Sequence, residues 1–199
     1  MTSRTAMTAG IAAGATEAAH LIERLDRLAR RGEASAELNP AQWEALRYVA
    51  RANRFSRNPA ALADYLGSTR GTVSQTLIAL EQKGLLERQP SERDRRSIDL
   101  ALTQAGTTAL RSDPIGNLAE DIAAALGKDA EKLAESLRAS LAHAIARNDG
   151  KPFGQCHTCR HFRRNVKPGS RQPHHCALLD APLSAADSDL ICVEQTPAA

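Results

Sequence analysis

The chain has 199 residues, of which 42% are hydrophobic but only 3% are aromatic, and its formal net charge at pH 7 is +3. This length suits one full domain with a small appendage, and a core filled by Ala and Leu suits closely packed helices. The weak charge alone does not indicate nucleic-acid binding. Because the chain has neither a run of about 18 apolar residues nor a Leu-rich leader, we expect a cytoplasmic protein with no membrane span.

A first helix is expected over residues 16–31, after an N-terminus over residues 1–15 that we expect to be disordered. Leu21, Leu25 and Leu28 recur in this helix at helical spacing and would form one apolar face. Such a face has to be covered, either by another part of the same chain or by a second copy of it.

Two helices with the same start signal follow. Asn39 and Asn58 each precede a proline. The Asn side chain can cap the first turn, and proline is tolerated there because its missing N–H would have no partner in the helix. The second helix is expected to end near residue 53, and the third at Gly67.

A fourth helix and a hairpin are predicted next. The helix is capped by Ser68 or Thr69, is closed by Gly84, and keeps its apolar residues on one face. Those residues are Val73, Leu77 and Leu80. Residues 85–88 and 98–102 favour β-structure and predict two strands joined by a basic turn. Helix, turn, helix and hairpin in this order are typical of a winged helix-turn-helix.

The polar face of the fourth helix carries the side-chain types that read DNA. Arg can bind guanine, Gln can bind adenine, and Ser and Thr can bind phosphate. The residues predicted to bind DNA from this helix are Ser68, Thr69, Arg70, Thr72, Ser74 and Gln75. Those predicted at the hairpin tip are Arg93, Asp94, Arg95 and Arg96, where Asp94 would orient a neighbouring Arg. A solvated helix face looks similar, so the hypothesis depends on the ordered set of elements.

Residues 38–106 resemble the MarR family of winged helix-turn-helix transcription regulators. The matching segments are NPAQWEAL from residue 39, LADYL from residue 62, TVS from residue 72, LEQKGLL from residue 80, DRRS from residue 94 and LTQAG from residue 102. The resemblance implies a homodimer, formed by helices at both chain ends, that binds a near-palindromic operator in double-stranded DNA. It also implies that Arg96 makes the groove contact of the wing and that Asp94 supports this contact.

Three more helices are expected after the hairpin, over residues 104–111, 117–126 and 129–148. Asp113, Pro114 and Gly116 interrupt the long helix that follows the wing in the family, which is a departure from its pattern. The later helices carry apolar stripes that a winged-helix core does not need. They therefore favour a dimer, in which two recognition helices would lie about one DNA turn apart, over packing within one chain.

All four cysteines lie in the last quarter of the chain, and they predict a metal site there. They are Cys156, Cys159, Cys176 and Cys192. One Cys-x-x-Cys pair with two isolated cysteines is typical of an iron–sulfur cluster, and the spacing resembles that of high-potential iron–sulfur proteins, which implies a 4Fe–4S cluster. The alternative is zinc, for which His161, His174 and His175 could supply nitrogen ligands. A metal-free thiol and disulfide switch is a third hypothesis.

The sequence thus predicts a mainly α fold with three parts: the N-terminus over residues 1–15, a winged-helix and dimerisation domain over residues 16–150, and a small Cys-rich metal-binding module over residues 151–199. The predicted function is a DNA-binding transcription regulator that responds to redox state or metal through the four cysteines. The alternative is a repressor that responds to a small-molecule effector and has a purely structural zinc tail. No nucleophilic triad, phosphate-binding loop or HExxH motif occurs in the sequence, so we do not expect an enzyme.

Overall fold

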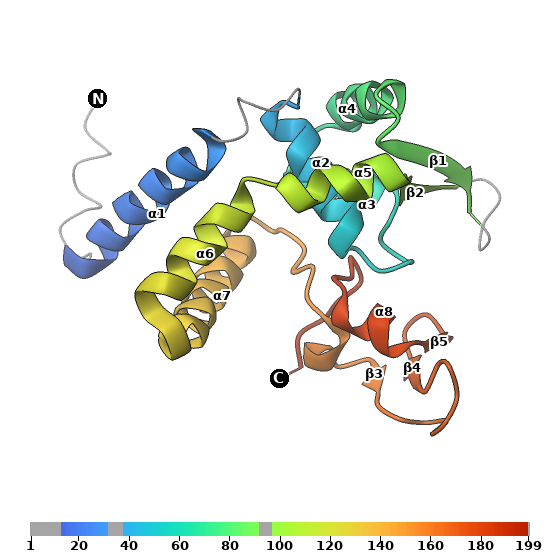
Figure 1. Cartoon of the computed structure of the whole chain (residues 1–199). Helices are drawn as coiled ribbons and strands as arrows, with labels where there is room; N and C mark the ends of the chain where they lie inside the picture. The colour runs from blue at the N-terminus through green and yellow to red at the C-terminus, as the bar shows by residue number, and fades with distance from the viewer. Residues whose placement is uncertain (1–12, 32–37, 92–96, 199) are drawn as a thin grey trace.

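The computed structural model describes residues 13–31, 38–91 and 97–198. The first part contains α1 (Ala13–Arg31), α2 (Pro40–Arg51), α3 (Pro59–Leu66), α4 (Arg70–Gln82), β1 (Leu86–Pro90) and β2 (Ile98–Leu102). The second part contains α5 (Gln104–Ala109), η2 (Leu110–Ser112), α6 (Ile115–Leu126), η3 (Gly127–Asp129) and α7 (Ala130–Arg147). The tail contains η4 (Cys156–Thr158), β3 (Phe162–Arg163), β4 (His174–Cys176), β5 (Ala181–Leu183) and α8 (Ala185–Asp189). In Figure 1 the helices α1, α6 and α7 lie on one side, and the winged helix-turn-helix lies above the tail on the other.

The helix starts follow the predicted capping signals. Asn39 accepts a hydrogen bond from the backbone N–H of Gln42 at 2.9 Å, and the Gln42 side chain accepts one from the Asn39 N–H at 3.2 Å. Asn58 caps α3 through the N–H of Ala61 at 2.9 Å. Each cap satisfies backbone donors that the first turn leaves without partners, so the predicted positions of α2 and α3 are confirmed.

The core of the winged helix is built on α2, α3 and α4. Trp43, Leu46, Leu62, Leu77 and Leu80 are each at most 1% exposed, and the hairpin adds Leu86 and Leu100 to the same apolar cluster. The predicted stripe of α4 is therefore confirmed. The mainly α, winged-helix prediction is confirmed as well, because the observed order of elements is the predicted one.

The hairpin and the helix after it are held by a short local network. The strands pair antiparallel with Leu86 opposite Leu102. The hydroxyl of Thr103 accepts a hydrogen bond from the Gly106 N–H at 3.0 Å and donates one to the carbonyl of Gly84 at 2.6 Å. A side chain at Gly106 would overlap the carbonyl oxygen of Leu85, so only glycine lets α5 lie this close to the start of the hairpin.

The interruption predicted after the hairpin is present, and the structure shows what it does. Asp113 lies between η2 and α6, and its carboxylate accepts a hydrogen bond at 3.0 Å from the N–H of Ile115, the first residue of α6. The same carboxylate pairs with Arg47 of α2 at 2.5 Å and 2.8 Å. Gly116 was expected to interrupt the helix, but α6 starts at Ile115 and Gly116 lies inside it.

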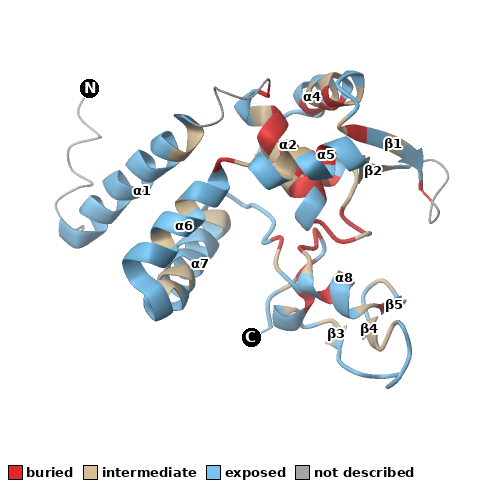
Figure 2. Ribbon diagram, viewed as in Figure 1, coloured by how far each residue is buried: buried red, intermediate tan, exposed pale blue. Residues whose placement is uncertain are grey.

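Helices α1, α6 and α7 are largely exposed. None of their residues is buried, and Figure 2 shows them almost entirely in the colours of exposed and intermediate residues. Helix α1 contacts α6, and α6 contacts α7. The exposed fractions of Leu21, Leu25, Leu28 and Leu141 lie between 41% and 58%. One copy of the chain therefore leaves these apolar faces without a cover.

The N-terminal prediction was wrong in its last residues, because Ala13, Gly14 and Ala15 already belong to α1. The Ala-rich composition of this segment favours a helix, and a helix needs no apolar stripe to begin. The first strand also differs from the prediction, since it starts at Leu86 and continues to Pro90. Among the described residues, no helix has both the length and the apolar character needed to cross a membrane.

The tail is folded but contains little regular structure. Its strands form a three-stranded antiparallel sheet in the order β3-β4-β5. Phe153, Ile191 and Val193 of the tail are buried in the same apolar cluster as the winged helix, and Leu183 is buried in a second cluster with Phe55 and Cys156. The domain boundary at residue 150 stays a prediction, but the tail and the winged helix share a core.

We expect Gly106→Ala to lower the free energy of unfolding by about 1–3 kcal/mol, because the added methyl group overlaps backbone that cannot move away. Thermal unfolding followed by circular dichroism measures this as a Tm several degrees lower. Gly116→Ala is the matched control. It lies in a helix with open space around it and should leave stability unchanged or raise it by up to about 1 kcal/mol. Equal effects of the two substitutions would contradict the role of Gly106.

Candidate DNA-binding surface and four-cysteine site

The N-terminal half of α4 presents a polar face to solvent. Arg70, Thr72 and Gln75 are exposed, as predicted for residues that reach DNA, and Ser68 and Ser74 are half-buried. Opposite them, Val73 and Leu77 are buried against α2 and α3. The alternation places one polar face outward over two turns, which is the surface that a recognition helix needs.

The hydroxyl of Thr69 also has a structural role. It accepts a hydrogen bond from the Thr72 N–H at 3.1 Å and lies 2.9 Å from the Thr72 hydroxyl. Thr69 is therefore the N-cap of α4, and its hydroxyl holds the end of the helix. Of the predicted set, Arg70 and Gln75 have long exposed side chains, and these can extend farthest from the helix.

The angle between α3 and α4 is set by the turn at Gly67. Its φ of 58° lies in the left-handed region that favours glycine. The N–H of Ser68 then donates to the carbonyl of Ala63 at 3.0 Å and closes the end of α3. This tight turn holds α4 across α3 with its polar face free.

The hairpin is fixed against α4. Arg88 of β1 forms a salt bridge with Glu81 of α4, with a nitrogen–oxygen distance of 3.1 Å. The predicted tip residues Arg93, Asp94, Arg95 and Arg96 lie outside the described residues, so their roles stay predictions. The described strands end beside this tip, since Pro90 pairs with Ile98.

The comparisons with known proteins agree with this geometry. The sequence model of the MarR family matches residues 36–97 of this chain. The transcriptional repressor CouR, solved bound to a 23-mer DNA duplex, is 32% identical, with a TM-score of 0.50 over 64% of this chain and 89% of that chain. A single-residue mutant of MarR from E. coli is 23% identical, with a TM-score of 0.51 over 66% of this chain and 97% of that chain. No curated protein matches the chain by sequence.

This chain belongs to the MarR family. The predicted resemblance is thereby confirmed for the winged helix. This chain aligns with nearly the whole length of both solved structures, but the aligned part is only about two thirds of this chain. A MarR-family fold therefore does not require a length of chain equivalent to the Cys-rich tail.

The four cysteines are brought to one place. All four line a single small cavity of about 20 Å³, together with His161 and Phe162. Cys156 begins η4, Cys159 directly follows it, Cys176 ends β4, and Cys192 follows α8. Four thiols from three separate segments of the tail thus face the same space, as the sequence predicted.

The thiols do not converge as tightly as the ligands of one ion. Among the described residues, no three His, Cys, Asp or Glu side chains are grouped closely enough to hold a metal ion. Zinc takes its four ligands around a single ion, whereas a cuboidal cluster takes four thiolates around a larger body.

Burial, together with the neighbouring thiols Cys192, Cys176 and Cys159, raises the pKa of Cys156 to about 12. Burial also raises the pKa of Cys192, while the Asn53 side chain and the Glu194 backbone N–H oppose that rise. With no cation beside them, both thiols would be protonated at neutral pH. A bound metal reverses this, because a coordinating thiol is deprotonated.

The three predicted histidine alternatives are separated by the structure. His161 lines the cavity. The imidazole of His174 accepts a hydrogen bond from the Asn165 N–H at 3.0 Å and packs on Phe162. His175 pairs with the carboxylate of Asp180 at 3.2 Å. Only His161 of the three lies where it could replace a thiol.

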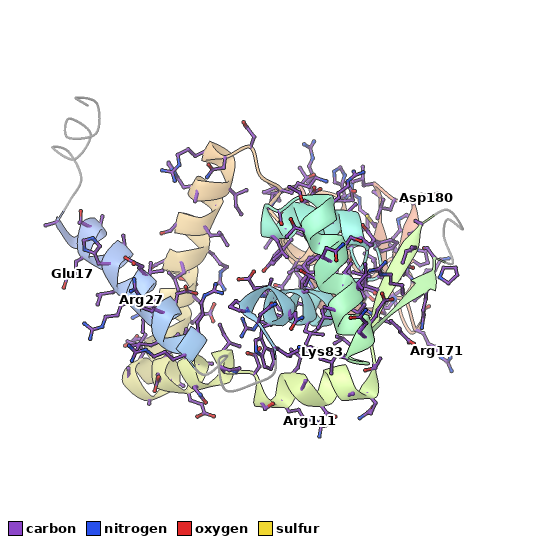
Figure 3. The ribbon with its side chains drawn as sticks, turned by 90° about the horizontal axis from the view of Figure 1, so that it is seen from above. Glu17, Arg27, Lys83, Arg111, Arg171 and Asp180 are labelled. Atoms are coloured by element: carbon purple, nitrogen blue, oxygen red, sulfur yellow. The ribbon has the colours of Figure 1, made fainter. Side chains whose placement is uncertain are left out.

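The sequence reasoning missed the residues that receive the tail. The loop between α2 and α3, residues 52–58, contains Asn53 and Ser56, which are both fully buried, and Phe55, which is 5% exposed. A lone aromatic residue in a polar connecting segment was the available signal, but its partners lie more than a hundred residues later in the chain. Figure 3 shows the opposite end of the molecule, where Glu17 and Arg27 project from α1, far from Arg171 and Asp180 of the tail.

We expect Arg70→Ala to weaken binding of a DNA site selected by the wild-type protein from random sequences. The loss of a base contact should cost about 1–3 kcal/mol, which is roughly 5- to 150-fold in Kd, measured by fluorescence anisotropy at fixed salt. Arg111→Ala removes the same charge from an exposed position on η2 and is the control. Equal Kd values for Arg70→Ala and the wild type would rule out Arg70 as a base-reading residue.

Proposed function

We propose that this MarR-family chain is a homodimeric, DNA-binding transcription regulator. The observation that carries the proposal is the exposed polar face of α4 beside a hairpin that Arg88 and Glu81 fix to it. A helix in the major groove and a hairpin at the neighbouring backbone are the contacts that this arrangement can make. The DNA-bound state of CouR, which is 32% identical to this chain, supports the proposal.

The dimer is proposed from the exposed apolar residues of α1, α6 and α7. Leu25 of α1, Ile115 of α6 and Leu141 of α7 are exposed by 41%, 45% and 58%. A monomer rarely leaves so many large apolar side chains in contact with water, and a two-fold interface would cover them in both copies. It would also place two α4 helices to read a near-palindromic site.

The four-cysteine site is proposed to hold an iron–sulfur cluster and to make the regulator responsive to the occupancy or redox state of that cluster. Cys156, Cys159, Cys176 and Cys192 would hold it, and the cluster would supply an electron-accepting centre. Two observations support a bound group. The four thiols line one cavity, and the amide nitrogen of the buried Asn53 has no oxygen or nitrogen partner in the described chain but affects the pKa of Cys192.

A second candidate function is a response to a small molecule, with the tail as a zinc-bound structural element. A cavity of about 730 Å³ lies between α7 and the tail, lined by Leu141, Ile145, Phe153 and Ile191, with Arg138 among its polar groups. This volume is within the range of small-molecule sites, and the mixture of apolar walls with few charged groups is typical of them.

The dimer hypothesis predicts that Leu141→Glu gives a monomer. The carboxylate would have to be buried without a partner in the interface, whereas it would be solvated in the monomer. Light scattering coupled to gel filtration should show half the wild-type mass, and circular dichroism should show an unchanged fold. Ala139→Glu is the control, because residue 139 lies on the opposite side of α7. A dimeric Leu141→Glu variant would exclude α7 from the interface.

The metal hypothesis is tested by anaerobic purification with metal analysis and a visible absorption spectrum. We expect about four iron atoms per chain and a broad band near about 400 nm. Cys156→Ser and Cys192→Ser should lose both signals, and His175→Ala, which does not line the cavity, should keep them.

Each other result of that measurement has a definite meaning. A colourless protein with about one zinc per chain that depends on His161 would replace the cluster with a structural zinc site and favour the small-molecule function. A protein without metal, even when purified anaerobically, would contradict both metal hypotheses. Neither result bears on the winged helix, whose DNA binding is measured separately.

A further inference from the structure

The loop between α2 and α3, residues 52–58, lies between the four-cysteine site and the elements proposed to bind DNA. On one side it pairs with the segment that carries Cys192, and on the other it contacts the hairpin and begins α3. Neither the family match nor the cysteine spacing points to this loop. The link between the four-cysteine site and the DNA-binding elements rests on the proposed function of both.

The tail side of the loop is fixed by hydrogen bonds on both sides of Cys192. Ile191 donates its N–H to the carbonyl of Arg51 and accepts a bond from the Asn53 N–H, both at 2.9 Å. The N–H of Val193 donates to the hydroxyl of Ser56 at 2.9 Å. The residues immediately before and after Cys192 are therefore bound to the end of α2 and to the loop, so a displacement of Cys192 also displaces the loop.

The side chain of Asn53 has an orientation that its hydrogen bonds determine. Its carbonyl oxygen accepts bonds from the Phe55 N–H at 3.1 Å and from the Ser56 hydroxyl at 2.9 Å. Because a backbone N–H can only donate, the oxygen of the amide must lie on that side. Its NH₂ group is then buried with no oxygen or nitrogen partner in the described chain and lies beside Cys192. A thiolate that binds a metal is an acceptor and would complete the bonding of this donor.

Phe55 gives the loop a second contact with the cysteines. It packs with Cys156 and Leu183 in the apolar cluster of the tail, against which Phe162 and Cys176 also pack. The neighbouring Arg54 donates a hydrogen bond to the carbonyl of Pro182. The side chains of three successive loop residues, 53 to 55, thus contact the tail. Asn53 contacts Cys192, and Phe55 packs with Cys156; both of these cysteines line the cavity.

The other side of the loop leads to the proposed DNA-binding elements. The carbonyl of Arg57 accepts a hydrogen bond from the N–H of Leu100 in β2 at 2.7 Å. The Arg57 side chain donates to the carbonyl of Ala52 at 2.8 Å and closes the loop on itself. The next residue, Asn58, caps α3. A displacement of the loop therefore acts on the hairpin and on the first helix of the helix-turn-helix together.

We propose that the α2–α3 loop transmits the state of the four-cysteine site to the helix-turn-helix and the hairpin, with Asn53 as the positioning residue for Cys192. An occupied site holds Cys192, and through residues 191–193 it holds the loop in the arrangement that caps α3 and pairs with Leu100. Removal of the metal releases Cys192 and loosens that arrangement. The occupied protein is then the form that binds DNA tightly.

The experiment compares metal-loaded and chelator-stripped full-length protein, each with the selected DNA site. Stripping should raise the Kd of the wild type at least about tenfold, within the usual range of coupling between sites. Hydrogen exchange followed by mass spectrometry should show faster exchange at residues 52–58 and 98–102 in the stripped form. Residues within α7 should not change and are the internal control.

Two variants separate the steps of the link. Arg57→Ala opens the loop without touching a cysteine, so it should keep the wild-type metal content but reduce the stripping effect to less than about threefold. Asn53→Asp keeps the acceptor for Phe55 and Ser56 but replaces the NH₂ donor beside Cys192 with an oxygen. It should release metal to a chelator about tenfold faster or more and shift the visible sulfur-to-iron band. Asn165→Asp, an exposed change of the same kind in the tail, should do neither.

The outcomes are distinguishable. A wild type that holds no metal, or that binds no DNA, contradicts the proposed function, and the link falls with it because it has nothing to transmit. A wild type that does both, but whose affinity changes less than about twofold on stripping, overturns the link alone. An unchanged stripping effect in Arg57→Ala also overturns it. If Asn53→Asp fails to fold, as circular dichroism would show, Arg57→Ala and the hydrogen-exchange pattern still decide.

Discussion

The pairing of residues 51–56 with residues 191–193 is the contact on which the remaining structure depends. Ala52 and Ile191 form a parallel bridge, and Ile191 and Val193 are buried in the same core as α2 and α3. The tail has short strands and a small apolar cluster of its own, which is too little to stabilise a segment of this length. Its fold therefore needs the winged helix, and the end of α2 is covered only when the tail is in place.

The sequence was most informative where the controlling interaction is local. Asn39, Asn58 and Thr103 each cap a helix through a backbone N–H three residues later, so the side chain and its partner fall within one turn. Gly67 shows the same locality, because its positive φ is a property of one residue. The extents of α2, α3 and α4 followed from such signals. The helical order of residues 13–15 did not, since it has no cap or apolar stripe in the described chain to announce it.

The candidate sites were predictable to different depths. The spacing of the cysteines predicted that they would gather, and all four line one cavity. Cys-x-x-Cys makes a turn, Cys176 lies in β4 opposite Phe162, and the N–H of Cys192 donates to the carbonyl of Gly154. The donor beside Cys192 was not predictable. Asn53 lies 139 positions away in the sequence, and a buried unpartnered amide is recognisable only when its surroundings are known. For α4, helical spacing identified the exposed face, and of the two predicted caps, Ser68 and Thr69, the structure shows that Thr69 is the one used.

Helix α2 connects all of these parts, which limits how the protein can respond. Near its start Glu44 pairs with Arg30 of α1 at 3.0 Å, and in its middle Arg47 pairs with Asp113 at the beginning of α6. At its end the carbonyl of Arg51 receives the N–H of Ile191. A rigid helix held at three levels transmits displacement rather than absorbing it. A change at the tail therefore acts both on the loop that begins α3 and, through α2, on α1 and the start of α6.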